Sequence, residues 1–219
     1  MLLEGKLILV MPSQDASPLM AVYICGREFN FKIDLFRRIQ VMSKYAFLIA
    51  FLFVAILAYK PVGAFNETPA VGAPAPTFTL TTNEGKQANL NDFKGKWVVL
   101  YFYPKDFTGG CTLEARNFQR DLTKYDAANA VVLGVSVDTA ESHKSFCAKE
   151  GLNFKLLSDA DAKVSELYGS VMEYNGAKLS ARNTFIIDPQ GKIAKVFVKV
   201  GPAGHSEEVL AALASLQKA

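Results

Sequence analysis

The sequence has few of the residues that most often bind metals. Its 219 residues include three cysteines and two histidines. It contains no CxxC or HxxxH pair, so the ligand spacing of a zinc site is missing. Three cysteines are also too few for a disulfide scaffold. We therefore expect no metal site, and we expect His143, four residues before Cys147, to be a surface histidine.

An excess of charge of one sign is also missing from most of the chain. The formal net charge is +3, but residues 65–219 contain 17 basic and 17 acidic side chains. No basic cluster or nucleic-acid motif occurs, which excludes the usual nucleic-acid-binding classes. A nucleotide-binding loop, a CxxCH haem attachment and a flavin fingerprint are missing too. We therefore expect neither a nucleic-acid partner nor a cofactor.

One long apolar run, residues 46–59, lies before the balanced part of the chain. Its length suits the core of a secretory signal, about 7–15 residues, better than the roughly 20 needed to span a bilayer. The residues that follow, Val-Gly-Ala, fit a signal cleavage site, so we predict cleavage after Ala64. Residues 42–64 are interpreted as a signal peptide, with an uncleaved membrane anchor as the alternative.

Residues 1–41 do not resemble the short basic start of a signal, because they contain several acidic side chains. Our hypothesis is that translation begins at Met42 and that residues 1–41 are a misassigned extension. Cys25 lies in this leader, residues 1–64, and is given no chemical role. Export would place the mature protein in the periplasm or the thylakoid lumen, and an uncleaved leader would leave it anchored to a membrane.

The rest of the chain, residues 65–219, is predicted to be one α/β domain. Two fully apolar stretches, residues 97–103 and 131–137, are typical of central strands buried on both faces. Strands alternate with helices early and pair through tight turns late, which predicts a central mixed β-sheet flanked by helices on both faces, with an N-terminal β-hairpin. The other predicted elements are a hairpin over 77–90, one helix with an apolar stripe over 115–125, a strand at 154–157, a helix over 161–168 and a hairpin over 184–200.

The starts of two helices are predicted from capping residues. Asp138 and Glu141 have the spacing of a capping box, and Gly151 suits the end of the same helix. Ser206 is predicted to cap the last helix.

Cys111 opens a predicted helix directly after a buried strand, in the stretch YFYPKDFTGGCTLEA. The backbone N–H groups at a helix start have no intrahelical partner and the helix dipole is positive there, so negative charge is favoured. A thiolate is a far better nucleophile than a thiol. Position alone leaves a buried, unreactive cysteine as an equal alternative.

The spacing P-x-x-x-T-x-x-C at Pro104, Thr108 and Cys111 resembles the active-site loop of the peroxiredoxins, in particular the Q-type or bacterioferritin-comigratory group. The likeness covers most of residues 71–200 and includes the stretches VGAPAPTFTL, LNDFKGKWVVLYFYP, VLGVSVDTAESHKSF, LNFKLLSDAD and RNTFIIDPQGK. This resemblance implies a thioredoxin-like fold and a thiol-dependent peroxidase that reduces hydrogen peroxide and organic hydroperoxides.

The resemblance also implies a role for four residues. Cys111 corresponds to the peroxidatic cysteine, Thr108 to the hydroxyl that hydrogen-bonds it, Pro104 to the proline that shields it, and Arg182 to the arginine that supports the thiolate. This role of Arg182 is physically reasonable, because a cation with several donors beside the sulfur would stabilise the negative charge that shifts from sulfur to oxygen during the reaction. Glu114 also matches the family pattern, but a favourable charge near a helix start explains it equally well.

The second sulfur departs from the commonest pattern of the group. Arg116 stands where many members carry the resolving cysteine that captures the sulfenic acid. Cys147 corresponds to the position that other members use, and we favour it; the alternative is a one-cysteine enzyme recycled directly by an external thiol. A Cys111–Cys147 disulfide would require the first turn around Cys111 to unwind, because disulfide Cα atoms lie within about 7 Å.

Two other classes of protein share this fold. A disulfide oxidoreductase would need CxxC at the helix start, where Thr108 stands instead of the first cysteine. A binding domain without peroxidase activity is the non-enzymatic alternative. From the resemblance, the expected partners are a hydroperoxide and thioredoxin or a similar dithiol reductant, and the expected state is a monomer.

Overall fold

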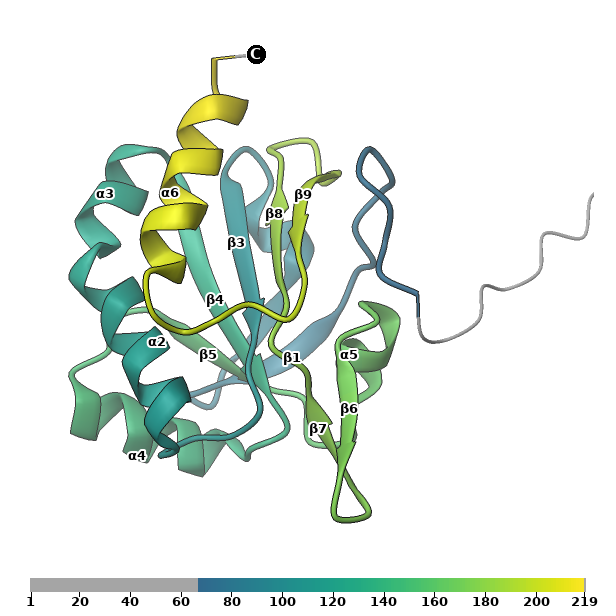
Figure 1. Ribbon diagram of the computed structural model, residues 1–219, viewed down its shortest axis with the longest axis vertical. Coiled ribbons are helices and arrows are strands. Elements are labelled where there is room, and N and C mark those ends of the chain that lie inside the picture. The colour runs from purple at the N-terminus through teal and green to yellow at the C-terminus, as the bar shows by residue number, and fades with distance from the viewer. Residues whose placement is uncertain (1–66, 219) are drawn as a thin grey trace, which may run out of the picture. The chain divides into compact units, whose positions relative to one another are not determined.

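The computed structural model describes residues 67–218 (Figure 1), so the predicted leader lies outside the described residues. A seven-stranded sheet with the order β2-β1-β5-β4-β3-β8-β9 forms the centre of the described part. A separate two-stranded sheet pairs β6 with β7. The strands are β1 (Thr79–Thr82), β2 (Gln87–Asn89), β3 (Trp97–Phe102), β4 (Ala130–Ser136), β5 (Lys155–Ser158), β6 (Val171–Tyr174), β7 (Ala177–Ser180), β8 (Thr184–Ile187) and β9 (Ile193–Phe197).

The sheet is mixed, as the sequence predicts. β3, β4 and β5 run parallel to one another and are connected by helical crossovers. β8 and β9 then add an antiparallel edge, and β1 with β2 forms the predicted N-terminal hairpin at the other edge. The carboxyl end of the central strand β3 therefore lies inside the sheet, where residues from several elements can meet.

Helices cover both faces of the sheet (Figure 1). α2, α3, α4 and α6 pack on one face, where their apolar side chains join one core cluster. α5 and a short 3-10 helix, η1, contribute to a second cluster on the opposite face. Their bounds are η1 (Leu90–Phe93), α2 (Gly109–Arg120), α3 (Leu122–Ala127), α4 (Ala140–Glu150), α5 (Lys163–Leu167) and α6 (His205–Leu216).

The central strand β3 is apolar along its whole length because both of its faces are buried. Val99 and Tyr101 point into the cluster beneath α2, α4 and α6. Leu100 and Phe102, which alternate with them, point into the other cluster. This rigid strand fixes the position of the loop that follows it, and that loop leads to Cys111.

The structure corrects the prediction of one helix over 115–125. Two helices, α2 and α3, meet at Asp121, which ends the first and begins the second. The buried carboxylate of Asp121 accepts hydrogen bonds from Arg120, Lys124 and Ser206. The contact with Ser206, far away in the sequence, stabilises a break that helical periodicity cannot reveal.

Both predicted helix caps are wrong as well. The N-cap of α4 is Thr139, whose side chain accepts a hydrogen bond from the backbone N–H of Ser142 at 3.2 Å. Asp138 instead accepts from the Ser136 hydroxyl and from the backbone N–H of Asp106. α6 begins after Gly204 in a left-handed conformation, and the Ser206 hydroxyl donates to Asp121. In each case a tertiary partner takes the predicted capping side chain.

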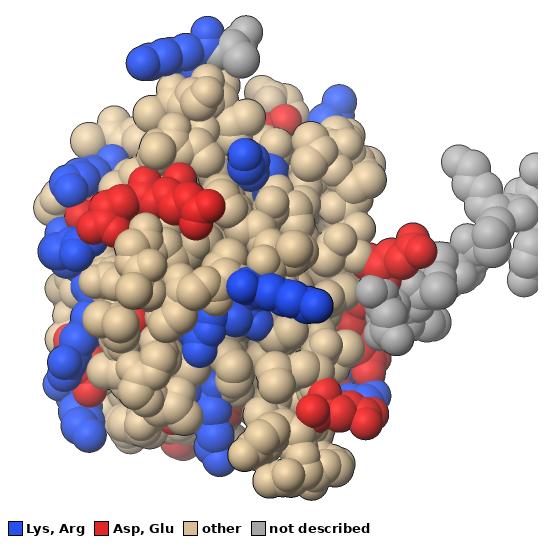
Figure 2. Space-filling model, in the orientation of Figure 1, with Lys and Arg blue, Asp and Glu red and all other residues tan. Residues whose placement is uncertain are grey.

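Acidic and basic side chains are interspersed on the face that Figure 2 shows, and wide uncharged areas separate them. Among residues 67–218, no helix has the length and the apolar character needed to cross a membrane.

Candidate active site

Cys111 is the third residue of α2, and its side chain is only 2% exposed. The backbone at Thr108 is extended, and its carbonyl accepts the first helical hydrogen bond, from Thr112 at 2.9 Å. Gly109 and Gly110 form the first helical positions, and a Cβ at Gly110 would lie 3.4 Å from Arg182 Nη2 and 3.6 Å from the ring of Pro202. The sulfur thus lies in the first turn, where the helix favours negative charge.

Arg182 reaches this sulfur from the segment between β7 and β8. Its Nη2 donates to Cys111 Sγ at 3.3 Å, and its Nη1 donates to Glu114 Oε2. The Arg182 side chain is 18% exposed, so much of its charge is shielded from water. One planar guanidinium therefore joins the sulfur and a carboxylate in the same helical turn, which fixes its orientation.

Glu114 belongs to the site, although the sequence alone gives it a second-rank place. Its side chain is 1% exposed, and Oε1 has no hydrogen-bond partner among the described residues. Burial raises the pKa of Glu114 to about 7, and the charge of Arg182 opposes this rise only in part. Glu114 can therefore change its charge near neutral pH while it orients Arg182 toward the sulfur.

Thr108 and Pro104 lie in the loop before Cys111, as the sequence places them. The Thr108 hydroxyl donates to the backbone carbonyl of Lys105 at 3.0 Å and makes no hydrogen bond to Cys111 Sγ in this structure. This geometry differs from the expected hydrogen bond between the hydroxyl and the sulfur, because the side chain turns back onto its own loop. Its oxygen keeps lone pairs that can accept a hydrogen bond from a bound hydroxyl group. Pro104 is half-buried directly after the central strand.

Cys147 lies in α4 and is 7% exposed. It belongs to the same apolar cluster as Cys111, and both thiols are free. Burial, with a smaller contribution from the charge of Asp106, raises the pKa of Cys147 to about 12. We call this arrangement, in which Cys147 is buried and forms no disulfide, the closed form. In it the second thiol is protonated and unreactive at neutral pH.

A buried polar network beside the site was missed by the sequence reasoning. Asp106 Oδ1 accepts from the Tyr103 hydroxyl at 2.7 Å. Asp106 Oδ2 accepts from the Ser142 hydroxyl at 2.7 Å and lies 2.9 Å from His143 Nδ1. The prediction that His143 is a surface residue is wrong, because its side chain is fully buried. The four-residue spacing of His143 and Cys147 predicts that they share one helix face, but it does not reveal the buried partner Asp106.

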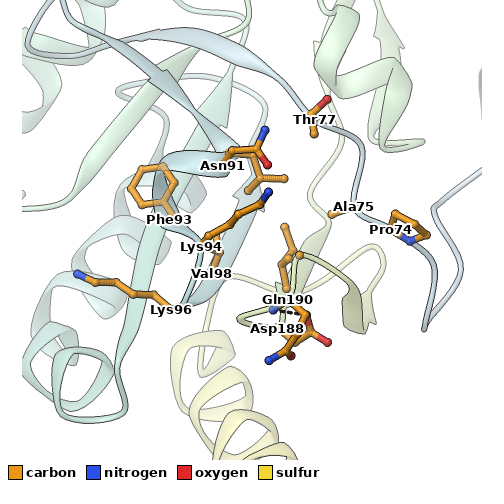
Figure 3. A pocket seen from close by; sticks show the side chains of 13 residues that line it. Pro74, Ala75, Thr77, Asn91, Phe93, Lys94, Lys96, Val98, Asp188 and Gln190 are labelled. Carbon is orange, nitrogen blue, oxygen red and sulfur yellow. Dashed lines mark hydrogen bonds between the residues drawn. The ribbon is translucent and has the colours of Figure 1, made fainter.

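The pocket drawn in Figure 3 is not this site. It has a volume of about 180 Å³ and is lined by Val98 of β3 and Ile187 of β8, with Lys94, Asn91 and Gln190 among its polar residues. Val98 lies at the start of β3, whereas the loop to Cys111 follows its end. The pocket therefore opens at the opposite end of the sheet. Among the described residues, no group of three or more His, Cys, Asp or Glu side chains could hold a metal ion.

A buried cysteine at a helix start, hydrogen-bonded by an arginine on a thioredoxin-like sheet, defines the class of thiol peroxidases called peroxiredoxins. The chain belongs to the AhpC/TSA family, whose model matches residues 71–196. It is 42% identical over 146 residues to peroxiredoxin Bcp of Xanthomonas campestris, an alignment that covers 64% of this chain and 91% of that relative. The protein is thus a peroxidase, and the expected family and activity are confirmed.

Solved structures confirm the thioredoxin-like fold. A structure of Xylella fastidiosa PrxQ, with one cysteine replaced by serine, matches with a TM-score of 0.65 and 35% identity, and covers 68% of this chain and 98% of that one. Two forms of Xanthomonas campestris peroxiredoxin Q match with TM-scores of 0.63 and 38% identity, and each covers 68% of this chain and 98 or 99% of its own. Each form lacks a different cysteine, and the two positions are 36 residues apart. A trapped intermediate/ligand complex of the same bacterium's bacterioferritin comigratory protein is described in terms of its alkyl peroxide reduction activity.

Proposed function

We propose that Cys111 is the peroxidatic cysteine of this peroxidase, with Arg182, Thr108 and Pro104 completing its site. The observation that carries this proposal is the hydrogen bond from Arg182 Nη2 to Cys111 Sγ at 3.3 Å. A half-buried cation that donates directly to a sulfur stabilises the thiolate and, during reaction, the charge that moves onto oxygen. An unreactive core cysteine would have no need of this partner.

In the proposed first step the thiolate attacks one oxygen of the hydroperoxide. A sulfur–oxygen bond forms, the oxygen–oxygen bond breaks, and the departing alkoxide or hydroxide takes up a proton. Arg182 supplies donors for the developing charge, the Thr108 oxygen accepts a hydrogen bond from the peroxide hydroxyl, and Pro104 covers the loop side of the site. Cys111 is left as a sulfenic acid.

We propose that Cys147 resolves this sulfenic acid. The thiol of Cys147 attacks Cys111, a disulfide forms, and the hydroxyl leaves as water with the thiol proton. The separation of Cys111 and Cys147 is 36 residues, which equals that of the two cysteines replaced in the Xanthomonas campestris forms. Because Cys147 is buried and protonated in the closed form, this step needs local unwinding of α2 or α4.

The proposed substrates are hydrogen peroxide and organic hydroperoxides, and the proposed reductant is thioredoxin or a similar dithiol that returns two electrons to the disulfide. The alkyl peroxide reduction described for the Xanthomonas campestris protein supports the organic substrates. Phe107 and Leu113, which flank the site in sequence, are 47% and 44% exposed and can contact an alkyl group.

Intact mass and peptide mapping of the peroxide-treated protein test both cysteines. Wild type should lose two hydrogens and yield a peptide pair linking Cys111 to Cys147. Cys147→Ser should gain one oxygen at Cys111, or more at higher peroxide, and Cys111→Ser should stop consuming peroxide. If Cys111→Ser consumed peroxide at the wild-type rate, the assignment of the site would be wrong. If Cys147→Ser still lost two hydrogens, another thiol would replace Cys147 as the resolving residue. If wild type gained one oxygen at Cys111 and formed no disulfide, the one-cysteine alternative would hold.

The location of the protein also stays a proposal. We propose that residues 42–64 direct export to the periplasm or the thylakoid lumen, on the strength of the apolar run at 46–59, and that the mature protein acts as a monomer. N-terminal sequencing should find Phe65 at the mature end. A mature protein that retains the run and sediments with membranes would instead support the anchored form. Sedimentation analysis of the soluble domain tests the monomer.

A further inference from the structure

The active-site loop and the helix that carries Cys147 are joined by a buried link. Asp106, five residues before Cys111, accepts hydrogen bonds from two consecutive residues in the first turn of α4, Ser142 and His143. The side chains of Asp106 and His143 are 1% and 0% exposed. Water therefore cannot easily replace these contacts, and removal of one partner leaves the other buried without its bond.

The same loop is held against its neighbours by two further contacts. The backbone N–H of Asp106 donates to Asp138 Oδ2 at 2.8 Å, in the connection between β4 and α4. The ring of Phe107 packs edge-on against Phe146, the residue before Cys147, with centroids 5.1 Å apart. The position of the loop that leads to Cys111 is thus coupled to the position of the helix that carries Cys147.

One atom in this link is left without a partner. His143 Nδ1 faces a carboxylate oxygen and so carries the ring hydrogen in the neutral form, while the buried Nε2 has no hydrogen-bond partner among the described residues. A buried nitrogen without a partner is unfavourable, and it would regain a hydrogen bond from water if α4 moved outward. The unpartnered nitrogen therefore makes the closed form less stable, and outward movement of α4 would remove this unfavourable free energy.

We propose that the Asp106–His143 pair is a latch that holds α4 against the active-site loop, so that opening this pair is what releases Cys147 to attack the sulfenic acid. This inference rests on the proposed role of Cys147. Both residues are positioning residues, because neither touches the reacting sulfur atoms. The latch sets how a sulfenic acid on Cys111 divides between two fates: condensation with Cys147 to a disulfide and water, or reaction with a second hydroperoxide to a sulfinic acid.

The test measures, in the full-length protein, how much of the Cys111 sulfenic acid becomes disulfide and how much becomes sulfinic acid. Reduced enzyme is mixed with graded hydrogen peroxide, quenched by alkylation, and mapped for the Cys111–Cys147 disulfide and for Cys111 sulfinic acid. Replacement of His143 by Phe keeps a ring but removes the donor to Asp106. We expect it to raise the peroxide concentration that half-converts Cys111 to sulfinic acid by about tenfold, the size expected from loss of a charged hydrogen bond.

Three variants serve as comparisons. His143→Asn can still donate to Asp106 from a nitrogen close to the Nδ1 position and should restore the wild-type value to within about twofold. Ser142→Ala removes one weaker donor and should give an intermediate increase of about fivefold, even if His143→Phe fails to fold. Arg116→Ala breaks a different link between α2 and α4, the ion pair with Glu150 at 2.6 Å. Arg116 is 64% exposed, so this pair should matter little.

The possible outcomes separate the latch from the proposed function. If wild type forms no Cys111–Cys147 disulfide, the role of Cys147 is wrong and the latch has no step to control. If the disulfide forms but His143→Phe and Ser142→Ala keep the wild-type division, the latch is wrong and resolution by Cys147 stands. Equal changes in His143→Phe, His143→Asn and Arg116→Ala would indicate a general loss of stability, which also overturns the latch.

Discussion

The two cysteines of the folded domain have the same kind of burial and opposite electrostatic surroundings. Cys111 is 2% exposed and Cys147 is 7% exposed, and both belong to the apolar cluster on one face of the sheet. Cys111 lies at a helix start with an arginine nitrogen 3.3 Å from its sulfur. Cys147 lies near the end of a helix, where burial and the nearby Asp106 oppose a negative charge.

This difference shows that burial alone does not decide whether a thiol reacts. Desolvation disfavours a thiolate in both places, and only one place supplies a compensating cation and unpaired backbone donors. Under the proposed resolving role, the second thiol reacts only after the structure around it opens, so its reactivity would be set by α4 as well as by the side chain. The same apolar cluster thus contains one thiol beside a cation and one thiol without such a partner.

The largest effect should come from removing the charge that distinguishes the two sites. Arg182→Met keeps the length and packing of the side chain but removes the donor to Cys111. We expect sulfenic acid formation to slow by about 10²–10³-fold, as for loss of one donor to a developing oxyanion. Stopped-flow mixing with hydrogen peroxide measures this rate. Arg116→Met, in the helix α2 that also carries Cys111, is the matched control and should stay close to wild type. Equal losses in both variants would contradict a specific role for Arg182.

The next effect concerns the carboxylate that orients Arg182. The pKa of Glu114 rises from 4.5 to about 7 on folding. Between pH 4.5 and pH 7 the folded protein therefore holds a proton on Glu114 that the unfolded chain has released. Stability therefore falls as pH rises from 4.5 through 7, by about 3 kcal/mol for this one group. Glu114→Gln cannot titrate and should lose this part of the pH dependence.

Urea unfolding at pH 5 and pH 8 tests this expectation for Glu114. The difference in unfolding free energy, wild type minus Glu114→Gln, should be lower at pH 8, because all other titrating groups are shared. A difference that grew with pH would mean that the ion pair with Arg182 outweighs the burial of Glu114, and it would contradict the predicted sign.

How much of this could be predicted from the sequence depends on the range of the interactions. The strands at 97–103 and 131–137 were placed to within one residue, because an apolar run is itself the cause of a strand buried on both faces. The contact between Cys111 and Arg182 could not come from spacing, since 71 residues separate them, and it was expected only from the family resemblance. His143 was misplaced on the surface, because only its tertiary partner Asp106 makes its burial acceptable.

The smallest effect should come from the N-terminal cap of α4, the helix that carries Cys147. Thr139 caps this helix through its contact with the Ser142 N–H, and Thr139→Ala should cost about 1 kcal/mol, mostly in the first turn of the helix. Because Cys147 must leave the closed form to react, we expect disulfide formation to become faster by up to about fivefold. Quenched alkylation after mixing with peroxide gives this rate.

The matched control for Thr139→Ala is Asn89→Ala, which removes the capping box of η1. Its loss of stability should be similar, but η1 contributes to the other core cluster and carries neither cysteine. If both variants accelerated disulfide formation equally, the second thiol would depend on global unfolding. If only Thr139→Ala does so, the helix that carries Cys147 controls its reactivity, and the contrast between the two thiols is one of local stability as well as of charge.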